Sequence, residues 1–458
     1  MPAPELAEIA AYASRRAPGP AALAAFTGDL AGALHPDRVT TLEAARLAAS
    51  RDGAYLSPLL SAVLPDRTAD VVVRPTGTGE LLTAVRLAHE HGVPVVARGR
   101  GTGNYGQAVP LAGGLVVDLT GADRVIEVGD GWIHAEAGAT FVALEAAARR
   151  RGQEIAMMPT TVGSTIGGFL AGGAGGIGSI EHGWLWDGFV LALDVVTCPP
   201  GDAPLRVHGR NCLPYLHAYG VTGIIATATV RLAPARRRTA VLASFPGAAW
   251  AQATGAAQAM LRLDPPPRLV SLDDAALVET YPADPKLPSG RLSLRAVVDI
   301  DTVSEVTRLI TASGGRIESV AEDAIGYVST LAFNHVTLRA RKARPDLCHL
   351  QVGGEPLVSD PDAVRACLPG AMLHLDGLRN HLDPADPVRG RGFGGLLLSE
   401  FRDARTLYDG VDRLRERGVH VIDPHTWELG GPALPGIRAA AAANDPLGLL
   451  NPGKLPAA

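Results

Sequence analysis

The sequence predicts an α+β fold with more than one domain: a two-lobed first part, followed by a cap built on an antiparallel sheet with helices on one face. Three observations support this expectation. The chain has 458 residues, which is too long for one compact core. Hydrophobic residues make up 47% and charged residues 19%, the balance of an ordinary globular protein. Strand and helix patterns alternate along the chain, and glycine-rich segments follow two of the strands.

The first part opens with helices and continues into a strand–helix–strand unit. Residues 1–60 have the pattern of helices, with Thr40 as an expected N-cap. Residues 69–73 form a short apolar strand, residues 78–91 an amphipathic helix and residues 93–97 the next strand. Two strands joined by one helix predict a parallel pair.

The later elements divide the chain into four regions. Strands are expected at 115–119, 125–128, 132–138, 189–197 and 223–232, with a helix at 141–151. After a junction at 234–238, strand and helix patterns alternate again: 241–245, 250–263, 268–272, 291–300, 303–313, 396–398 and 404–417. We therefore expect an N-terminal helical segment (1–60), a first domain (61–236), a substrate or cap domain (237–420) and a C-terminal segment (421–458).

Charge and cysteine usage exclude several classes of protein. The net charge is −5, and acids and bases are mixed along the chain, so no nucleic-acid partner is expected. The four cysteines show no metal-ligand spacing, which favours reduced thiols in a cytoplasmic protein without a metal. The N-terminus lacks the apolar core of a secretory signal, and no apolar run is long enough to predict a membrane span.

Two glycine-rich segments carry the functional argument. Residues 98–107 (RGRGTGNYGQ) follow one strand, and residues 159–179 form a second segment with hydroxyl side chains. Glycines after a strand let backbone N–H groups converge on a phosphate. Two such segments about sixty residues apart favour an extended dinucleotide. A Rossmann fold is disfavoured because the first segment leads into Val109-Pro110 and a strand, whereas a Rossmann loop opens a helix.

The order of four motifs resembles a known flavoprotein family. RGRGTG after a strand, PTTVGSTIGG, GIIATATVRL and a terminal NPGK are similar to the FAD-binding fold of the vanillyl-alcohol oxidase/para-cresol methylhydroxylase (PCMH-type) flavoproteins. Within that superfamily, the chain resembles the branch that contains D-lactate dehydrogenase and the GlcD chain of glycolate oxidase. The resemblance covers residues 60–235 and 420–455 well and the middle region in outline. It implies FAD as the cofactor.

The resemblance also implies a place for each motif. The first segment would bind the pyrophosphate, with Tyr105 facing either the flavin or the core: Arg98, Gly99, Arg100, Gly101, Thr102, Gly103, Asn104 and Tyr105. The second would line the ribityl chain and the isoalloxazine ring: Pro159, Thr160, Thr161, Gly163, Ser164, Thr165, Gly167, Gly168, Gly175, Gly178 and Ser179. Gly223 and Ile225 would meet the adenine half. Asn451 and Lys454 would return to the flavin, where a cation stabilises negative charge on the ring. Thr102 occupies the place of a histidine that carries covalent FAD in some members, so non-covalent FAD is expected.

The catalytic residues are less constrained by the sequence. A base must accept the substrate's O–H or N–H proton, and His335 is the first candidate, beside Asn334 and Arg339 as substrate ligands. His425 is the second candidate and His381 the third. An ordinary core or surface histidine remains the alternative for each. The metal- and substrate-binding HxGDGNxH string of the hydroxy-acid dehydrogenases is absent, so the substrate need not be a 2-hydroxy acid.

These inferences predict an FAD-dependent oxidase or dehydrogenase. It would take a hydride from a C–H next to oxygen or nitrogen of a small organic substrate onto flavin N5, with O2 or a carrier as electron acceptor. A non-redox flavoenzyme and a flavin-binding electron-transfer subunit remain alternatives. The sequence is compatible with a homodimer and does not specify the substrate.

Overall fold

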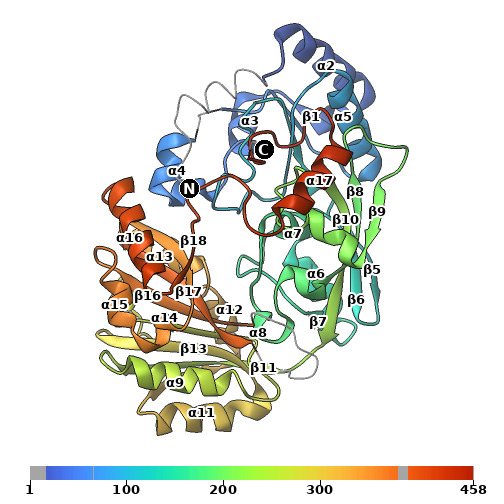
Figure 1. Ribbon diagram of the computed structural model, residues 1–458. Coiled ribbons are helices and arrows are strands. Elements are labelled where there is room, and N and C mark those ends of the chain that lie inside the picture. The colour runs from blue at the N-terminus through green and yellow to red at the C-terminus, as the bar shows by residue number, and fades with distance from the viewer. Residues whose placement is uncertain (1–16, 65–66, 380–389, 457–458) are drawn as a thin grey trace. The chain divides into compact units, whose positions relative to one another are not determined.

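The computed structural model describes residues 17–64, 67–379 and 390–456, and the chain divides into two compact units (Figure 1). Unit 1 comprises Met1–Ala174, Gly188–Ala235 and His425–Ala458. Unit 2 comprises Gly175–Asp187 and Arg236–Pro424. The second glycine-rich segment therefore crosses from unit 1 into unit 2.

The first sheet of unit 1 is mixed and has the strand order β1-β2-β4-β3. The three buried strands β2 (Val71–Val73), β4 (Leu115–Asp118) and β3 (Val95–Arg98) are parallel, and β1 (Val39–Thr40) is antiparallel to β2. The strand–helix–strand unit is confirmed, with α5 (Thr78–Glu90) between β2 and β3. The two strands are not neighbours, however, because β4, whose valines and leucine are fully buried, takes the central position between them.

The second sheet of unit 1 is antiparallel and is built around β10. Its order is β5-β6-β10-β8-β9, and β7 pairs with the end of β10. The strands are β5 (Val125–Gly129), β6 (Trp132–Glu136), β7 (Gln153–Ile155), β8 (Val190–Val196), β9 (Leu205–His208) and β10 (Ile224–Pro234). The helices of the same region are α6 (Phe141–Arg149), α7 (Ile166–Gly172) and α17 (Leu434–Asn444).

The N-terminal segment is helical with one short strand. Its helices are α2 (Pro20–Ala33), α3 (Glu43–Ala49) and α4 (Pro58–Val63). The expected N-cap is wrong, because Thr40 lies in β1 and Leu42 precedes α3. Thr40 belongs to the edge strand β1 and pairs with Val72 of β2, which keeps it out of the helix. Residues 1–16 of this expected helical region lie outside the described residues.

Unit 2 is built on an eight-stranded antiparallel sheet. Its order is β14-β11-β13-β12-β16-β17-β15-β18. The strands are β11 (Arg238–Pro246), β12 (Leu269–Asp273), β13 (Arg291–Asp299), β14 (Arg316–Ala321), β15 (Leu347–Gly353), β16 (Met372–Arg379), β17 (Arg391–Glu400) and β18 (His420–Ile422). The expected α+β fold with an antiparallel cap sheet is confirmed.

Helices pack along the unit 2 sheet. They are α8 (Ser179–His182), α9 (Trp250–Met260), α10 (Ala275–Val278), α11 (Val303–Ala312), α12 (Ile325–Ser329), α13 (His335–Ala343), α14 (Pro356–Ser359), α15 (Pro361–Arg365) and α16 (Ala404–Glu416). Figure 1 shows α9 and α11 side by side along the sheet. An apolar cluster joins α10, α12 and α13 to the strands, through Val278, Val328, Val336, Leu242 and Leu396. In the described part of the chain, no helix is both long and apolar enough to cross a membrane.

Candidate cofactor site and active site

The first glycine-rich loop, residues 98–107, follows β3. Gly101 and Gly106 have φ of +64° and +75°, the left-handed region that glycine adopts without strain. Within the described part of the chain, none of the five backbone N–H groups from Arg100 to Asn104 donates a hydrogen bond. Such a row of unused donors is an anion-binding arrangement that suits a phosphate group.

A hydroxyl pair joins this loop to the second glycine-rich segment. Thr102 Oγ1 lies 2.9 Å from Ser164 Oγ, and either oxygen can be the donor. A Cβ on Gly99 would collide with the Thr165 side chain, so glycine is required for this close approach. Thr165 Oγ1 also accepts a hydrogen bond from Gly168 N (3.3 Å) and so caps α7. The first segment and the unit 1 part of the second, far apart in the sequence, thus meet within unit 1.

The C-terminal segment of unit 1 donates hydrogen bonds to backbone carbonyls of the first loop. Asn451 is buried, has φ +39° and donates through Nδ2 to Gln107 O (2.8 Å) and Tyr219 O (2.7 Å). Lys454 Nζ, which is also buried, donates to Gly106 O (2.6 Å). Burial lowers the pKa of Lys454 to about 7, against the attraction of Asp52. A buried amine that titrates near neutral pH therefore lies against the loop.

The comparison with protein families falls on this region. Residues 69–203 match the FAD binding domain family. This part of the chain is an FAD-binding domain. FAD is the cofactor of this domain, and the resemblance drawn from the four sequence motifs is confirmed.

Related proteins share the FAD-binding domain over part of their length. D-lactate dehydrogenase of Archaeoglobus fulgidus is 32% identical over 181 residues, which cover 38% of this chain and 41% of that protein. Glycolate oxidase subunit GlcD of Bacillus subtilis is 28% identical over 177 residues, which cover 36% of this chain and 37% of that protein. The matched region thus spans less than half of these relatives. A solved structure of alkyldihydroxyacetonephosphate synthase has a TM-score of 0.72 at 16% identity and covers 96% of this chain and 86% of that one, which shows that the shared fold includes both units.

The residues of the FAD-binding domain fit a dinucleotide. The unused N–H groups of Arg100–Asn104 suit its pyrophosphate. Asn451 Oδ1 is a buried acceptor with no hydrogen-bond partner among the described residues, and a buried polar atom of this kind calls for a donor. The N–H of a flavin ring is such a donor. Lys454, three residues later, brings a buried amine to the same segment.

Arg98 also has a structural contact beside the first loop. Its guanidinium donates to Ala49 O (2.6 Å) and Arg51 O (2.7 Å), two carbonyls of the N-terminal segment. A Cβ on Gly101 would collide with this guanidinium. Arg98 therefore fastens the N-terminal segment to the loop, and its contact with the pyrophosphate stays a prediction.

The remaining predicted cofactor residues fall into three places. Those of unit 1 that flank the joined segments are Gly103, Asn104, Tyr105, Pro159, Thr160, Thr161, Gly163 and Gly167. Gly223 (φ +146°) precedes β10, where Ile225 is buried beside Val195. Gly175, Gly178 and Ser179 belong to unit 2, where Gly178 N donates to Arg268 O (2.9 Å) and Ser179 Oγ accepts from Gly176 N (2.9 Å). Their contacts with FAD stay predictions.

The sequence analysis missed two strained residues beside these segments. His217 and Tyr219 both have φ of +50° although neither is glycine. His217 Nδ1 lies 2.8 Å from Gly173 O, and Tyr219 N donates to Ala171 O (2.9 Å), so both residues contact the C-terminal end of α7. Strained backbone of this kind gathers at functional sites. No local sequence pattern predicts this backbone conformation, because the hydrogen-bond partners come from distant parts of the chain.

Asp52 was missed as well. Its carboxylate accepts from Ala54 N (2.9 Å) and Ala108 N (3.3 Å), and the neighbouring Gly53 N donates to Gly103 O (2.6 Å). Burial raises the pKa of Asp52, while Lys454 draws it down. The residue thus links the N-terminal segment, the first loop and the buried amine. The sequence signal was an Asp-Gly pair, which also marks ordinary turns.

His425, the second predicted base, has a structural contact. It lies in unit 1, is 1% exposed, and its Nδ1 is 2.7 Å from Ser57 Oγ. Ser57 Oγ also accepts from Leu60 N (3.0 Å) and caps α4. His425 therefore ties the C-terminal segment to α4, and its role as a base stays a prediction.

His335, the first predicted base, begins α13 in unit 2. Burial and the charge of Arg339 both lower the pKa of His335, which favours the neutral imidazole. Arg339 donates through Nε to Thr330 O (2.9 Å) and through Nη2 to Thr330 Oγ1 (2.5 Å), and its guanidinium lies over the Tyr327 ring. Asn334 stands at the N-cap position. His381 lies outside the described residues.

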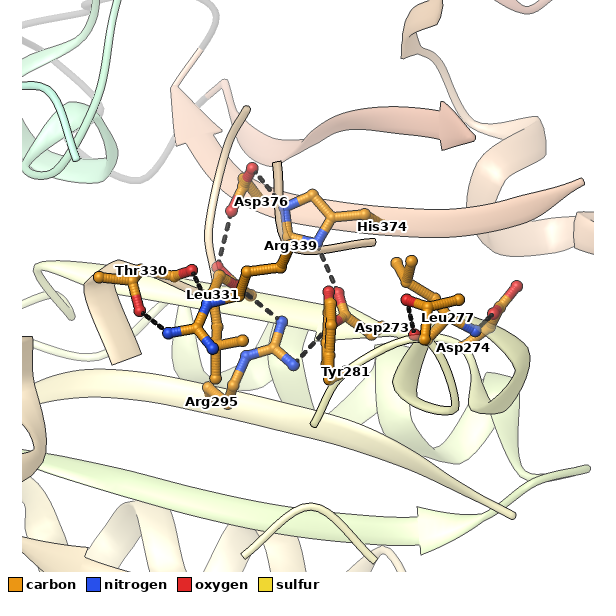
Figure 2. A network of polar contacts seen from close by, with 12 residues as sticks. Asp273, Asp274, Leu277, Tyr281, Arg295, Thr330, Leu331, Arg339, His374 and Asp376 are labelled. Atoms are coloured by element: carbon orange, nitrogen blue, oxygen red, sulfur yellow. Dashed lines mark hydrogen bonds and ion pairs between the residues drawn. The ribbon is translucent and has the colours of Figure 1, made fainter. Parts of the chain in front are cut away.

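A buried charged cluster, distant in sequence, contacts the chain immediately before this helix (Figure 2). His374 Nδ1 is 2.5 Å from Asp273 Oδ1, and its Nε2 is 2.8 Å from Asp376 Oδ2. Asp273 Oδ2 also accepts from Arg295 Nη1 (2.7 Å) and Tyr281 Oη (2.8 Å). Burial acts to lower the pKa of His374, but the two carboxylates outweigh it and raise it to about 9. Two acids and two bases thus neutralise one another in the core of unit 2.

Proposed function

We propose that the protein is an FAD-dependent oxidoreductase that oxidises a C–H next to oxygen or nitrogen in a small organic substrate. Bound FAD supplies the acceptor for the hydride that leaves the substrate carbon. The observation that carries the proposal is the single site made by the two glycine-rich segments and the C-terminal tail, with five unused N–H groups in its first loop. The FAD binding domain family match and the oxidoreductase names of two relatives support it.

The proposed roles within unit 1 follow the polar groups. The N–H groups of Arg100–Asn104 bind the pyrophosphate, and the segment around Ser164 and Thr165 lines the ribityl chain and the ring. Asn451 and Lys454 meet the ring from the tail. Lys454 offers a positive charge there without being fixed as a cation, because its pKa lies near 7.

We propose His335 as the group that accepts the substrate's O–H or N–H proton. A general base must be unprotonated at the working pH, and the lowered pKa of His335 meets this condition. Asn334, at the N-cap of α13, and Arg339, within α13, are the proposed substrate ligands. The electron acceptor is O2 or a carrier, and a cytoplasmic homodimer is the form to test first.

Anaerobic flavin reduction tests this function. The purified protein is mixed without oxygen with a panel of alcohols, amines, sugars and 2-hydroxy acids, and the visible flavin absorbance is followed. We expect at least one compound to bleach the flavin, with colour returning when oxygen or an artificial acceptor is added. Bound FAD that no compound of the panel reduces would contradict the proposal and favour a non-redox flavoenzyme or an electron-transfer subunit.

A further inference from the structure

The charged cluster of unit 2 holds the chain segment that leads into His335. Phe333 N donates to Asp376 Oδ2 (3.0 Å), the oxygen that also contacts His374. Arg295 Nη2 donates to Leu331 O (3.0 Å). Two of the four charged side chains thus bond directly to the backbone of residues 331–333, immediately before α13.

The held segment is strained. Phe333 has φ +51°, a left-handed conformation that is costly for a bulky residue and persists only where its surroundings impose it. Asn334 gives α13 no side-chain cap. The turn is instead fixed from outside, by Asp376 on the N–H of Phe333 and by Arg339, which folds back from α13 onto Thr330.

A role in stability alone does not explain why the buried residues of this cluster are charged. Asp273, Arg295 and His374 are each 0% exposed. Removing charges from water is unfavourable, and proteins with well-packed apolar side chains in their place are often as stable or more stable. What apolar side chains cannot do is accept a hydrogen bond from the N–H of Phe333. The charged cluster therefore fixes the position of the Phe333 N–H, although an apolar core could be equally stable.

We propose that Asp376, fixed by His374, is a positioning residue that sets the place of His335 through the backbone of Phe333. The inference rests on the proposed function for the role of His335 as a base, but the fixed turn itself is a property of unit 2. Asp376 acts through one carboxylate oxygen shared between the histidine and the turn, and Ser271 Oγ holds the other oxygen (2.6 Å).

The test compares Asp376→Ala with Tyr281→Phe in the full-length protein with FAD bound. Asp376→Ala removes one buried carboxylate of the cluster and Tyr281→Phe removes a hydrogen bond from another, but only Asp376 touches Phe333. Hydrogen exchange measured by mass spectrometry reports the Phe333 amide, and the rate of carbethoxylation by diethylpyrocarbonate reports His335. We expect Asp376→Ala to change both rates at least threefold. Tyr281→Phe should lower the melting temperature and leave both rates within twofold of the wild type.

A kinetic arm links the turn to the reaction. With the panel compound that bleaches the flavin fastest, at saturating concentration, Asp376→Ala should slow the limiting reduction rate at least tenfold. In a His335→Ala background the same change should slow it less than twofold, because the group that it positions is gone. If Asp376→Ala does not fold, Asp376→Asn, which keeps the side-chain shape, replaces it, with at least a threefold effect expected.

The outcomes separate the two claims. A wild-type reduction rate in His335→Ala would overturn the proposed base and leave the exchange and labelling data to decide the fixed turn. A slow His335→Ala with additive losses in the double variant would overturn the positioning role alone. Equal exchange and labelling rates in Asp376→Ala and Tyr281→Phe would overturn the inference whatever the substrate.

Discussion

Thr102 and Ser164 show how a single contact at the residue scale joins two distant glycine-rich segments. Their oxygens lie 2.9 Å apart, so removing either hydroxyl should let the segments separate and weaken FAD binding. We expect Thr102→Ala and Ser164→Ala each to raise the Kd for FAD three- to tenfold, about 0.6 to 1.4 kcal/mol. The double variant should be no weaker than the weaker single variant. Equilibrium dialysis measures these values.

A matched control is available on α5. Thr83 is another threonine with a hydroxyl contact, here to Gly79 O within its own helix. Thr83→Ala should leave the Kd for FAD unchanged. Additive losses in the Thr102/Ser164 pair would mean that the two hydroxyls act on the cofactor separately and not through each other.

Lys454 carries the second prediction at this scale. Its amine is buried, contacts Gly106 O and has a pKa near 7, so its protonation state depends on the charge of neighbouring groups. We expect Lys454→Met to weaken FAD binding at least tenfold, about 1.4 kcal/mol, while the apoprotein keeps its melting temperature within a few degrees. Fluorescence quenching of added FAD measures the first and calorimetry the second. Unchanged FAD affinity would remove Lys454 from the site.

Sequence reasoning identified residues of the site only where they belong to a recognisable motif. Thr102, Ser164, Asn451 and Lys454 stand in motifs with a recognisable order. His217 and Tyr219 do not, because their left-handed backbone is imposed by partners on α7 and the C-terminal tail. The contact of His425 with Ser57 was invisible for the same reason, since it joins residues 368 positions apart.

At the scale of elements, local patterns located most helices and strands but not their neighbours. The strand–helix–strand unit of residues 69–98 is where it was expected, yet β4 pairs with both strands and separates them. Strand order depends on which strand is buried on both faces, and the local pattern does not decide this. The sequence analysis assigned no helix to the second glycine-rich segment. Part of it is helix α7, because Thr165 caps a turn that glycines tolerate.

The cluster within the unit 2 sheet gives a prediction about pH. The pKa of His374 is about 9 in the folded protein against 6.5 for the free side chain, so the folded state holds a proton that the unfolded state loses first. Its contribution to stability is therefore complete below pH 6.5 and is lost as the pH rises through 9. The difference corresponds to on the order of 3 kcal/mol.

Urea unfolding of the wild type and His374→Gln checks this sign. On going from below pH 6.5 to above pH 9, the wild type should lose more free energy of unfolding than the variant. Tyr281→Phe, which keeps the histidine, should follow the wild type. A wild type and variant with parallel pH profiles would show that His374 is not the titrating group.

For the whole molecule, the sequence identified the cofactor domain better than the division of the chain. The four motifs led to FAD, but they did not reveal that residues 175–187 pack with unit 2, since this follows from tertiary contacts alone. The fold likeness across 96% of the chain extends over both units, whereas sequence similarity to the two dehydrogenase and oxidase relatives stays within about two fifths of it. The substrate is therefore to be sought by experiment, with the FAD-binding domain as the fixed point.

The cofactor content of the purified full-length protein tests the central claim most directly. The protein, released from its cofactor by denaturation, should yield unmodified FAD in a one-to-one ratio with the chain, identified by mass and by absorbance. Apoprotein should recover the visible flavin spectrum when FAD is added, and the Thr102→Ala variant should recover it less completely. A colourless protein that takes up no FAD on reconstitution would contradict the account.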